Sequence, residues 1–402
     1  MRGFSVFVLL SFCCLCFQAL GEEVLDVGLI YPRTGNFKQQ GLAQMRAALL
    51  AVDEINAQGG VLGKKVRLRP MDSGGRPDKA ARAVETLAAA NVRSVVGGAS
   101  SEEVLAISES SARRNMLYFV PQAASADVTG RSGRRNLFQE GCSARMAGRA
   151  LLEYLDQQFP NQKFFYITAG YTYADADIGA FFEATSMADR TAGQSYRDAL
   201  KQAVSSDAKV LVLMLYGDDL VQAMPLVDKL GLRRRMQIVV PYLNQDIVEQ
   251  AGPGLMEGVI GADTWAAQVP RMEGSSAGQA FNDAYVQRYQ AYPSSTAAST
   301  YGILYQWADA VRRASSADPD KLIMALEGHD YRLLKGEQQW RAFDHQNLQT
   351  LYVLKVKPRA EIMKDPLKQD YFEVVHRMDG DLAAPTLTEW QEARGVGRET
   401  LN

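Results

Sequence analysis

Hydroxyl side chains follow two neighbouring stretches that the sequence predicts to be buried strands. Ser100 and Ser101 come after one apolar run and a Gly-Gly pair, and Ser125 comes after the next apolar run. Ser100 can cap the helix that follows it, and Glu103 three residues later completes the pattern of a capping box. Such serines can simply satisfy backbone donors. Their recurrence after two adjacent strands instead favours a polar ligand site, because free N–H groups and hydroxyls point outward at this edge of a parallel sheet.

The elements that must position these serines alternate regularly between strands and helices. Apolar or alternating runs predict strands, and apolar residues three or four apart predict helices. The expected strands cover residues 26–31, 65–71, 92–96, 163–168, 209–216, 237–240, 258–264 and 351–356, and the expected helices cover 41–58, a segment from 78 onward, 277–291, 297–313 and 319–326. This alternation predicts an α/β protein with largely parallel sheets and right-handed crossovers. The tail after residue 358 shows no strong periodicity.

Length and charge narrow the class of protein. The chain has 402 residues, 47% of them hydrophobic and 22% charged, which suits two α/β domains. Its formal charge of −2 gives no basis for binding nucleic acid, which requires clustered Lys and Arg. The short basic run at residues 233–235 is interpreted as a solvated loop.

The N-terminus has the pattern of a signal peptide. Arg2 precedes an apolar stretch at residues 4–17, and Ala19-Leu20-Gly21 forms a small-x-small cleavage site. Cleavage after Gly21 leaves Cys142 as the sole cysteine, so we expect no internal disulfide. No later segment reaches membrane-spanning length without charges, and we expect an exported protein that is not inserted in the membrane.

Motifs of catalysis are missing from the sequence. It contains no Gly-x-Ser-x-Gly elbow, no Walker loop, no Gly-x-Gly-x-x-Gly fingerprint and no histidine pair at metal-ligand spacing. His345 follows Asp344, but no nucleophile stands beside this pair. We therefore expect no enzymatic activity, no cofactor and no metal.

Two segments near the N-terminus resemble a known family. Residues 27–35, Val-Gly-Leu-Ile-Tyr-Pro-Arg-Thr-Gly, and 51–63, Ala-Val-Asp-Glu-Ile-Asn-Ala-Gln-Gly-Gly-Val-Leu-Gly, are similar to the opening of periplasmic solute-binding proteins of ABC importers. The resemblance is to the branched-chain amino acid and amide-binding (Leu/Ile/Val-binding) family. Residues 97–101 and 121–125 match the two ligand turns of that family, and the resemblance continues more loosely through the rest of the chain.

The resemblance implies a two-lobed type I periplasmic-binding-protein fold with the ligand cleft between the lobes. After a signal peptide at residues 1–21, lobe one would comprise residues 22–139 and 268–345. Lobe two would comprise residues 140–267 and 346–402. Loops near Glu140, Ala267 and His345 would be the hinges, a geometry that supports closure of the domains.

Ligand-binding residues also follow from the resemblance. Ser100 and Ser101 match the first ligand turn, and Ala123, Ala124 and Ser125 form the second. In the family, lobe two adds side chains to the ligand site when the lobes close. The corresponding positions in this chain are Tyr173, Tyr216 and Tyr242. Each tyrosine can alternatively be an ordinary half-buried aromatic at a strand end.

Two departures from the family pattern bear on the ligand and the fold. Tyr242 stands where amino-acid binders place an acid against the ligand's ammonium group, and a buried ammonium without a carboxylate costs several kcal/mol. A neutral amide, an aromatic compound or a carboxylate-only ligand is thereby favoured, unless Asp218 or Asp219 substitutes. The segment between Tyr173 and Lys209 is short, which predicts that lobe two lacks one strand of the usual sheet.

The function implied is the extracytoplasmic substrate-binding component of an ABC transporter. A monomer in the periplasm would capture a small polar or amphiphilic solute and deliver it to the membrane permease subunits. A ligand-sensing module coupled to a signalling partner remains an alternative, because fold alone does not separate transport from sensing. An exported enzyme is the least favoured alternative.

Overall fold

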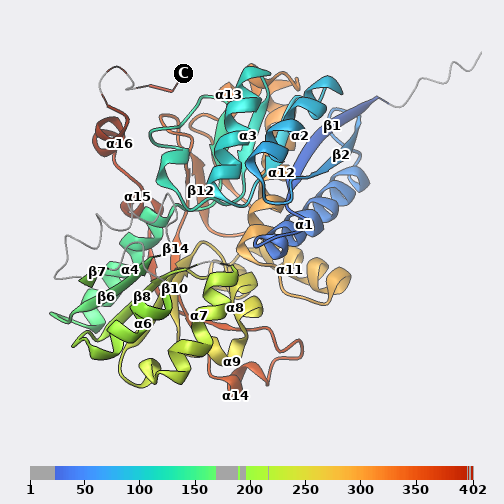
Figure 1. Cartoon of the computed structure of the whole chain (residues 1–402). Coiled ribbons are helices and arrows are strands. Elements are labelled where there is room, and N and C mark those ends of the chain that lie inside the picture. The colour runs from blue at the N-terminus through green and yellow to red at the C-terminus, as the bar shows by residue number, and fades with distance from the viewer. Residues whose placement is uncertain are drawn as a thin grey trace, which may run out of the picture.

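The computed structural model describes residues 23–168, 189–190, 196–215, 217–395, 397 and 400–401. It is an α/β structure with two main sheets arranged one above the other in Figure 1. The upper sheet has the order β2-β1-β3-β4-β5, and all its strands are parallel. Its strands are β1 (Val24–Tyr31), β2 (Lys65–Asp72), β3 (Ser94–Gly97), β4 (Leu117–Val120) and β5 (Leu137–Gln139). We call this sheet and the helices packed on it lobe one.

Helices cover both faces of the lobe-one sheet because side chains alternate along each strand. Val95 and Tyr118 belong to the small core beneath α2 and α3, whereas Val96 and Phe119 belong to the large core that includes α1 and α12. The helices of this lobe are α1 (Lys38–Ala57), α2 (Pro77–Ala89), α3 (Ser101–Arg113), α11 (Ser276–Tyr289), α12 (Ser295–Ala314) and α13 (Pro319–Leu326), with the 3-10 turn η1 (Ala126–Val128).

The lower sheet, in what we call lobe two, has the order β15-β14-β10-β9-β8-β6-β7. Its strands are β6 (Phe164–Thr168), β7 (Asp189–Arg190), β8 (Val210–Met214), β9 (Gln237–Tyr242), β10 (Ile260–Asp263), β14 (Leu351–Val356) and β15 (Phe372–Met378). Strands β14 and β15 are antiparallel additions to a parallel sheet. The prediction that lobe two lacks a strand was wrong, because the two-residue strand β7 pairs with β6. Strand β15 was also not expected from the sequence.

The elements around the lobe-two sheet are mostly short. The long helix α4 packs against β9, β10 and β14. The helices are α4 (Ala144–Gln158), α6 (Tyr196–Ser205), α7 (Asp218–Lys229), α8 (Gln245–Ala251), α9 (Pro253–Met256), α14 (Arg359–Ile362), α15 (Gly380–Ala383) and α16 (Leu387–Arg394), with the 3-10 turn η3 (Leu232–Arg234). Helix α10 (Val269–Met272) follows the crossing after β10 and packs against α11 of lobe one. None of the described helices is long and apolar enough to cross a membrane.

The chain passes between the two sheets at three places, after β5, after β10 and before β14. A small sheet of β11 (Asp330–Arg332), β12 (Glu337–Trp340) and β13 (Asn347–Leu348) precedes the third crossing. The first and third crossings touch, because Gln139 forms a β-bridge with Gln346. Lys335 and Glu140 form an ion pair of 3.4 Å there, with side chains only 4% and 3% exposed. The crossings therefore form a packed hinge region.

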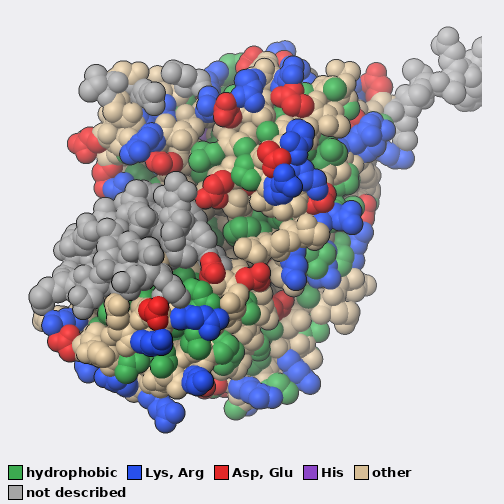
Figure 2. All heavy atoms as spheres, in the orientation of Figure 1, with side chains coloured by type: hydrophobic (Ala, Val, Ile, Leu, Met, Phe, Trp, Pro, Cys, Tyr) green, Lys and Arg blue, Asp and Glu red, His purple; other side chains and the backbone are tan. Residues whose placement is uncertain are grey.

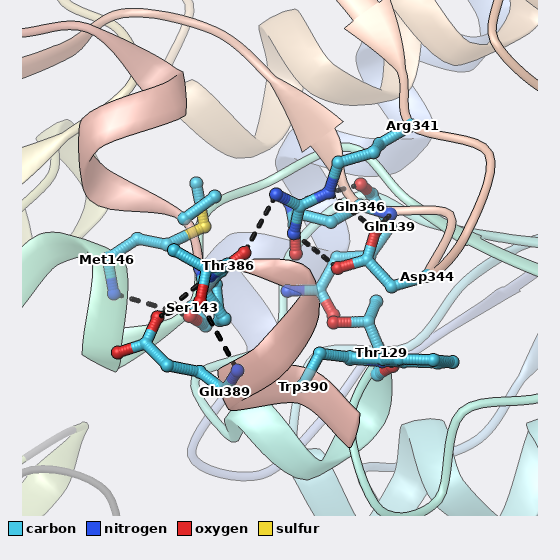
Figure 3. Close-up of polar contacts among 12 residues, drawn as sticks. Thr129, Gln139, Ser143, Met146, Arg341, Asp344, Gln346, Thr386, Glu389 and Trp390 are labelled. Atoms are coloured by element: carbon cyan, nitrogen blue, oxygen red, sulfur yellow. Dashed lines mark hydrogen bonds and ion pairs between the residues drawn. The ribbon is translucent and has the colours of Figure 1, made fainter. Parts of the chain in front are cut away.

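The C-terminal helix α16 contacts both lobes beside this hinge (Figure 3). On the lobe-two side, Glu389 accepts hydrogen bonds from Arg145 and Arg149 of α4. On the lobe-one side, the indole N–H of Trp390 donates to the carbonyl of Thr129 at 2.8 Å, and Arg394 donates to nearby backbone carbonyls. Residues 387–394 thus form a link between the lobes in addition to the three crossings.

Candidate functional site

The first serine turn is held tightly where β3 meets α3. Gly97 has a φ of +131°, and a Cβ there would lie 2.0 Å from the carbonyl oxygen of Ile30, so glycine is required. Ser100 caps α3, as expected, because its Oγ accepts the N–H of Glu103 at 3.2 Å. The carboxylate of Glu103 reaches back to the N–H of Ala99. These bonds fix Ser100 and Ser101 at the carboxyl edge of the sheet.

The second turn follows β4 and is bonded to the first. The N–H of Ser125 donates to Oγ of Ser101 at 3.2 Å, and Oγ of Ser125 accepts the N–H of Asp127. The carbonyl of Ala123 accepts from Gln139 at 3.1 Å. Both serine oxygens therefore already accept one backbone bond. Each hydroxyl still has its own proton to donate, and that of Ser101 lies in the lining of the cleft.

A cleft of about 320 Å³ lies between the lobes at this edge. Lobe one contributes most of its lining and lobe two the rest. The lining residues are Phe37, Gln40, Gly75, Pro77, Ala99, Ser100, Ser101, Glu102, Gln122, Ala123 and Ala124 from lobe one, and Gly217, Tyr242, Asn244 and Ile247 from lobe two. Of the predicted site residues, Ser125 lies behind the lining, and Tyr173 and Tyr216 lie outside the described residues. The structure brings the other predicted residues together in one cleft.

Tyr242 is placed by β9 at the floor of the cleft and is only 5% exposed. Its hydroxyl donates to the carbonyl of Cys142 in the first crossing at 2.8 Å. The hydroxyl proton is thus committed to the protein, and the side chain offers a ligand chiefly the surface of its aromatic ring.

The described lining carries little charge. Glu102 is its sole carboxylate among the residues that the structure describes. Asp218, considered above as a partner for an ammonium group, instead accepts from Gln250 and does not line the cleft. The apolar side chains of Phe37, Pro77 and Ile247 make the cleft suited to an apolar body that carries a small polar group.

Sequence reasoning missed two glutamines of the cleft. Gln40 of α1 is 8% exposed, and its Oε1 has no hydrogen-bond partner in the described part of the chain. Gln122 lies within the second turn segment, residues 121–125, and bonds to Thr296 and Ser295 at the start of α12. The signal for Gln40 was its position shortly after the loop that follows the first strand, at the same sheet edge as the serines.

The lobes touch each other across the mouth of the cleft. Gly217 of lobe two lies so close to Asn36 of lobe one that a Cβ at 217 would be 3.2 Å from both Cβ and the carbonyl oxygen of Asn36. The hydroxyl of Ser294 in lobe one faces the carboxyl of Asp246 in lobe two. The structure is therefore a closed arrangement of the two lobes.

His345 and Cys142 are not among the described residues that line the cleft. His345 is fully buried, stacks on Phe138 with ring centroids 3.9 Å apart and bonds to Glu327. Burial raises the pKa of the Cys142 thiol well above its usual range, so the reactive thiolate is disfavoured. Within the described ranges, no three His, Cys, Asp or Glu side chains are grouped to hold a metal ion.

Figure 2 shows Lys and Arg side chains interspersed with Asp and Glu over one face of the molecule, in keeping with the formal charge of −2. On this face the mixed signs extend over the described surface of lobe one. Its charge pattern resembles an ordinary solvated surface more than a polyanion-binding face.

Comparisons with known proteins agree with this architecture. The model of a family described as periplasmic binding protein matches residues 24–361. The Leu/Ile/Val-binding protein BraC3 of Rhizobium johnstonii is 35% identical over 117 residues, which span 29% of this chain and 32% of that protein. Leu/Ile/Val-binding protein homolog 8 of Brucella abortus is 27% identical over 334 residues, covering 75% of this chain and 80% of that protein.

Among solved structures, the branched-chain amino acid transporter substrate-binding protein LivJ of Streptococcus pneumoniae, in complex with isoleucine, has the same fold. It superposes with a TM-score of 0.75 at 23% identity and covers 89% of this chain and 100% of that one. This likeness confirms the expected two-lobed fold. With the family match over residues 24–361, the chain belongs to the periplasmic binding protein family.

Proposed function

We propose that this protein captures a small solute in the cleft and delivers it to the permease of an ABC importer. The observation that carries the proposal is the cleft itself, which has the serine turns of lobe one on one side and Tyr242 with Ile247 of lobe two on the other. A ligand that contacts both walls stabilises the closed arrangement only through its additional affinity for that state. A shift from mostly open to mostly closed takes about 5 kcal/mol.

The names of the relatives support a solute related to leucine, isoleucine or valine. Because Glu102 is the sole carboxylate of the described lining, the lining supports a solute without an ammonium group, such as an amide, an aromatic compound or a short carboxylate. If the solute is an amide, an aromatic compound or a short carboxylate, its carboxylate or polar head would contact the N–H groups and hydroxyls of the serine turns. A free ammonium group would require Glu102 or an acid outside the described residues. We propose a polar or amphiphilic solute of one of these kinds.

The proposed location is the periplasm, after cleavage near Gly21. Membership of the family supports this location. Amino-terminal sequencing of the exported protein should find Glu22 first, and a protein that begins at Met1 would exclude cleavage.

A thermal-shift screen tests the function. The panel would contain branched-chain amino acids, amides, urea, aromatic acids and short-chain acids. A solute at 100 times its Kd adds about 2.7 kcal/mol, a rise of a few degrees in Tm for a protein of this size. A hit among neutral or carboxylate-only compounds would support Tyr242 as the reason that amino acids are rejected. Stabilisation by leucine would instead support a carboxylate, Glu102 or an acid outside the described residues, that holds the ammonium group. No stabilisation by any compound of a broad panel would contradict solute capture.

The double substitution Ser101→Ala and Ser125→Ala tests the site. We expect the affinity for the solute found in the screen to fall at least tenfold, because the Ser101 hydroxyl donor is lost and the N–H of Asp127 loses the Ser125 oxygen that helps to fix the second turn. Ser108→Ala is the matched control, since this serine lies buried on the same helix as Ser101, its hydroxyl has no hydrogen-bond partner in the described structure, and it does not line the cleft. Unchanged affinity in the folded double variant would remove the site assignment.

A further inference from the structure

A carboxyl group is buried where lobe two meets lobe one beside the cleft. Asp246 lies in the first turn of α8 and is 8% exposed. Ser294, the N-cap residue of α12 in lobe one, faces this carboxyl, and Oδ2 of Asp246 has no hydrogen-bond partner among the described residues. Because α8 also packs against α1 of lobe one, the burial of Asp246 comes in large part from contact between the lobes.

The groups that face Asp246 leave its negative charge poorly balanced. Glu249 on the same helix and Asp263 at the end of β10 are further carboxyls, and Tyr285 approaches from α11. Arg46 of α1 is the cation that faces it, and this guanidinium also interacts with Tyr285 and lies 5.2 Å from the centroid of a second tyrosine ring. Asp246 and Glu249 thus share one arginine at the lobe contact, whereas the cation that faces Asp263 is Lys335.

We propose that closure of the lobes takes up a proton at Asp246, so that mildly acidic pH favours the closed form. A carboxylate in water is well solvated, whereas at the closed contact it loses water, and one of its oxygens lacks a partner. The neutral carboxylic acid avoids that desolvation cost. The open form retains the charge, and the closed form binds the proton.

The direction of the pKa shift agrees with this geometry. Burial, with a smaller contribution from Glu249 and Asp263, raises the pKa of Asp246 to about 7 in the closed arrangement. Exposure to water in the open form would return the pKa towards its usual value near 4. A group whose pKa is raised on closure opposes closure at pH above the raised value, and this opposition is relieved as the pH falls below it.

Distance measurements between two spin labels on the solute-free protein test the proposal. One label would replace Arg82 on α2 of lobe one and the other Lys229 on α7 of lobe two, both exposed, with mass spectrometry to confirm labelling at these positions. Between pH 7.5 and 5.5 we expect the ratio of closed to open protein to rise about 20-fold, from the pKa of about 7 in the closed form and the ordinary value in the open form. A closed population that is missing at pH 5.5, or equal at both pH values, would overturn the proposal.

Asp246→Asn removes this titrating group with little change of shape and should cut the rise to about fourfold or less, the most that the neighbouring Asp263, whose pKa burial raises to about 6, can contribute. Asp228→Asn, an exposed acid on α7, is the matched control and should retain the full rise. If the Asp246→Asn variant is poorly folded, Arg46→Met gives an independent test. Removing this cation should move the midpoint of closure to higher pH, and an unchanged midpoint would contradict the proposal.

This inference rests on the proposed function only for its biological consequence, which is tighter solute capture at mildly acidic pH. The label distances need no solute, so the two ideas fail separately. A pH-dependent closure in a protein that binds nothing in the screen would contradict solute capture alone. Solute binding with pH-independent closure would contradict the role of Asp246 alone.

Discussion

Gly217→Ala should prevent the lobes from closing fully. Gly217 is the N-cap residue of α7 and has φ and ψ of 53° and −131°, a backbone conformation that residues with a Cβ rarely adopt. The added methyl group would lie 3.2 Å from both Cβ and the carbonyl oxygen of Asn36 on the opposite lobe. Its cost therefore has two parts, a local strain present in open and closed forms and a contact present only in the closed form.

The two parts have different magnitudes and different consequences. The backbone strain is about 1–3 kcal/mol and lowers the stability of the whole protein. The contact with Asn36 is tighter than ordinary van der Waals contact and involves a backbone oxygen, so we assign it about 1–2 kcal/mol. Because this second part opposes closure alone, solute affinity should fall about 5- to 30-fold.

Calorimetric titration with a solute from the screen measures the affinity, and thermal unfolding measures the strain. Gly231→Ala is the matched control, since Gly231 has a φ of +69° but no atom within 4 Å of the added Cβ. This control should lose stability and keep its affinity. Asn36→Gly in the Gly217→Ala background removes one of the two contacts and should restore part of the affinity.

Two results would refute this reasoning. Equal affinity in Gly217→Ala and in the unchanged protein would show that the solute-bound state does not bring Asn36 against Gly217. An equal loss of affinity in Gly231→Ala would show that backbone strain, and not contact between the lobes, weakens binding.

Three further substitutions test the hinge region and the loop beyond β2. Trp390→Leu removes the indole hydrogen bond to Thr129 and should lower the free energy of unfolding by about 2 kcal/mol in urea titrations. The C-terminal segment should also be cleaved faster by a protease. Stability and protease resistance equal to those of the unchanged protein would exclude α16 as a link between the lobes. Lys335→Met leaves the buried carboxylate of Glu140 without its cation and should lower the free energy of unfolding by about 3–5 kcal/mol in chemical unfolding. Adding Glu140→Gln should restore much of that free energy. A second, additive loss of stability in the double variant would contradict the pairing. Burial raises the pKa of Asp72, but an ammonium group and two backbone N–H groups outweigh it and lower the pKa to about 2, so this carboxylate stabilises the fold above pH 4 and the contribution is lost between pH 4 and 2. Asp72→Asn should therefore reduce stability by about 1 kcal/mol at pH 7, after allowance for solvent screening, and by much less at pH 2.

Much of the architecture could be predicted from the sequence because its signals are local. The alternation of apolar runs and amphipathic helices, with Gly59-Gly60 at the end of the first helix, indicated parallel α/β lobes. Ser100 could be identified as a helix cap, because capping depends on a residue and its neighbours three positions on. The strand β15 gave no such signal, since its outer side chains are partly exposed and its pairing partner β14 is what orders it.

The environment of each side chain in the cleft was decided by the tertiary structure. The sequence placed Tyr242 at a strand end, but only the fold brings the carbonyl of Cys142, one hundred residues earlier, to its hydroxyl. The approach of Gly217 to Asn36 and the burial of Asp246 against Ser294 likewise depend on contact between lobes. Sequence by itself determined which segments form strands, helices and turns, because backbone preference and hydrophobic periodicity act over a few residues. Which side chains are desolvated, paired or left without a partner depends on surfaces far apart in the chain, and those meet only when both lobes are assembled.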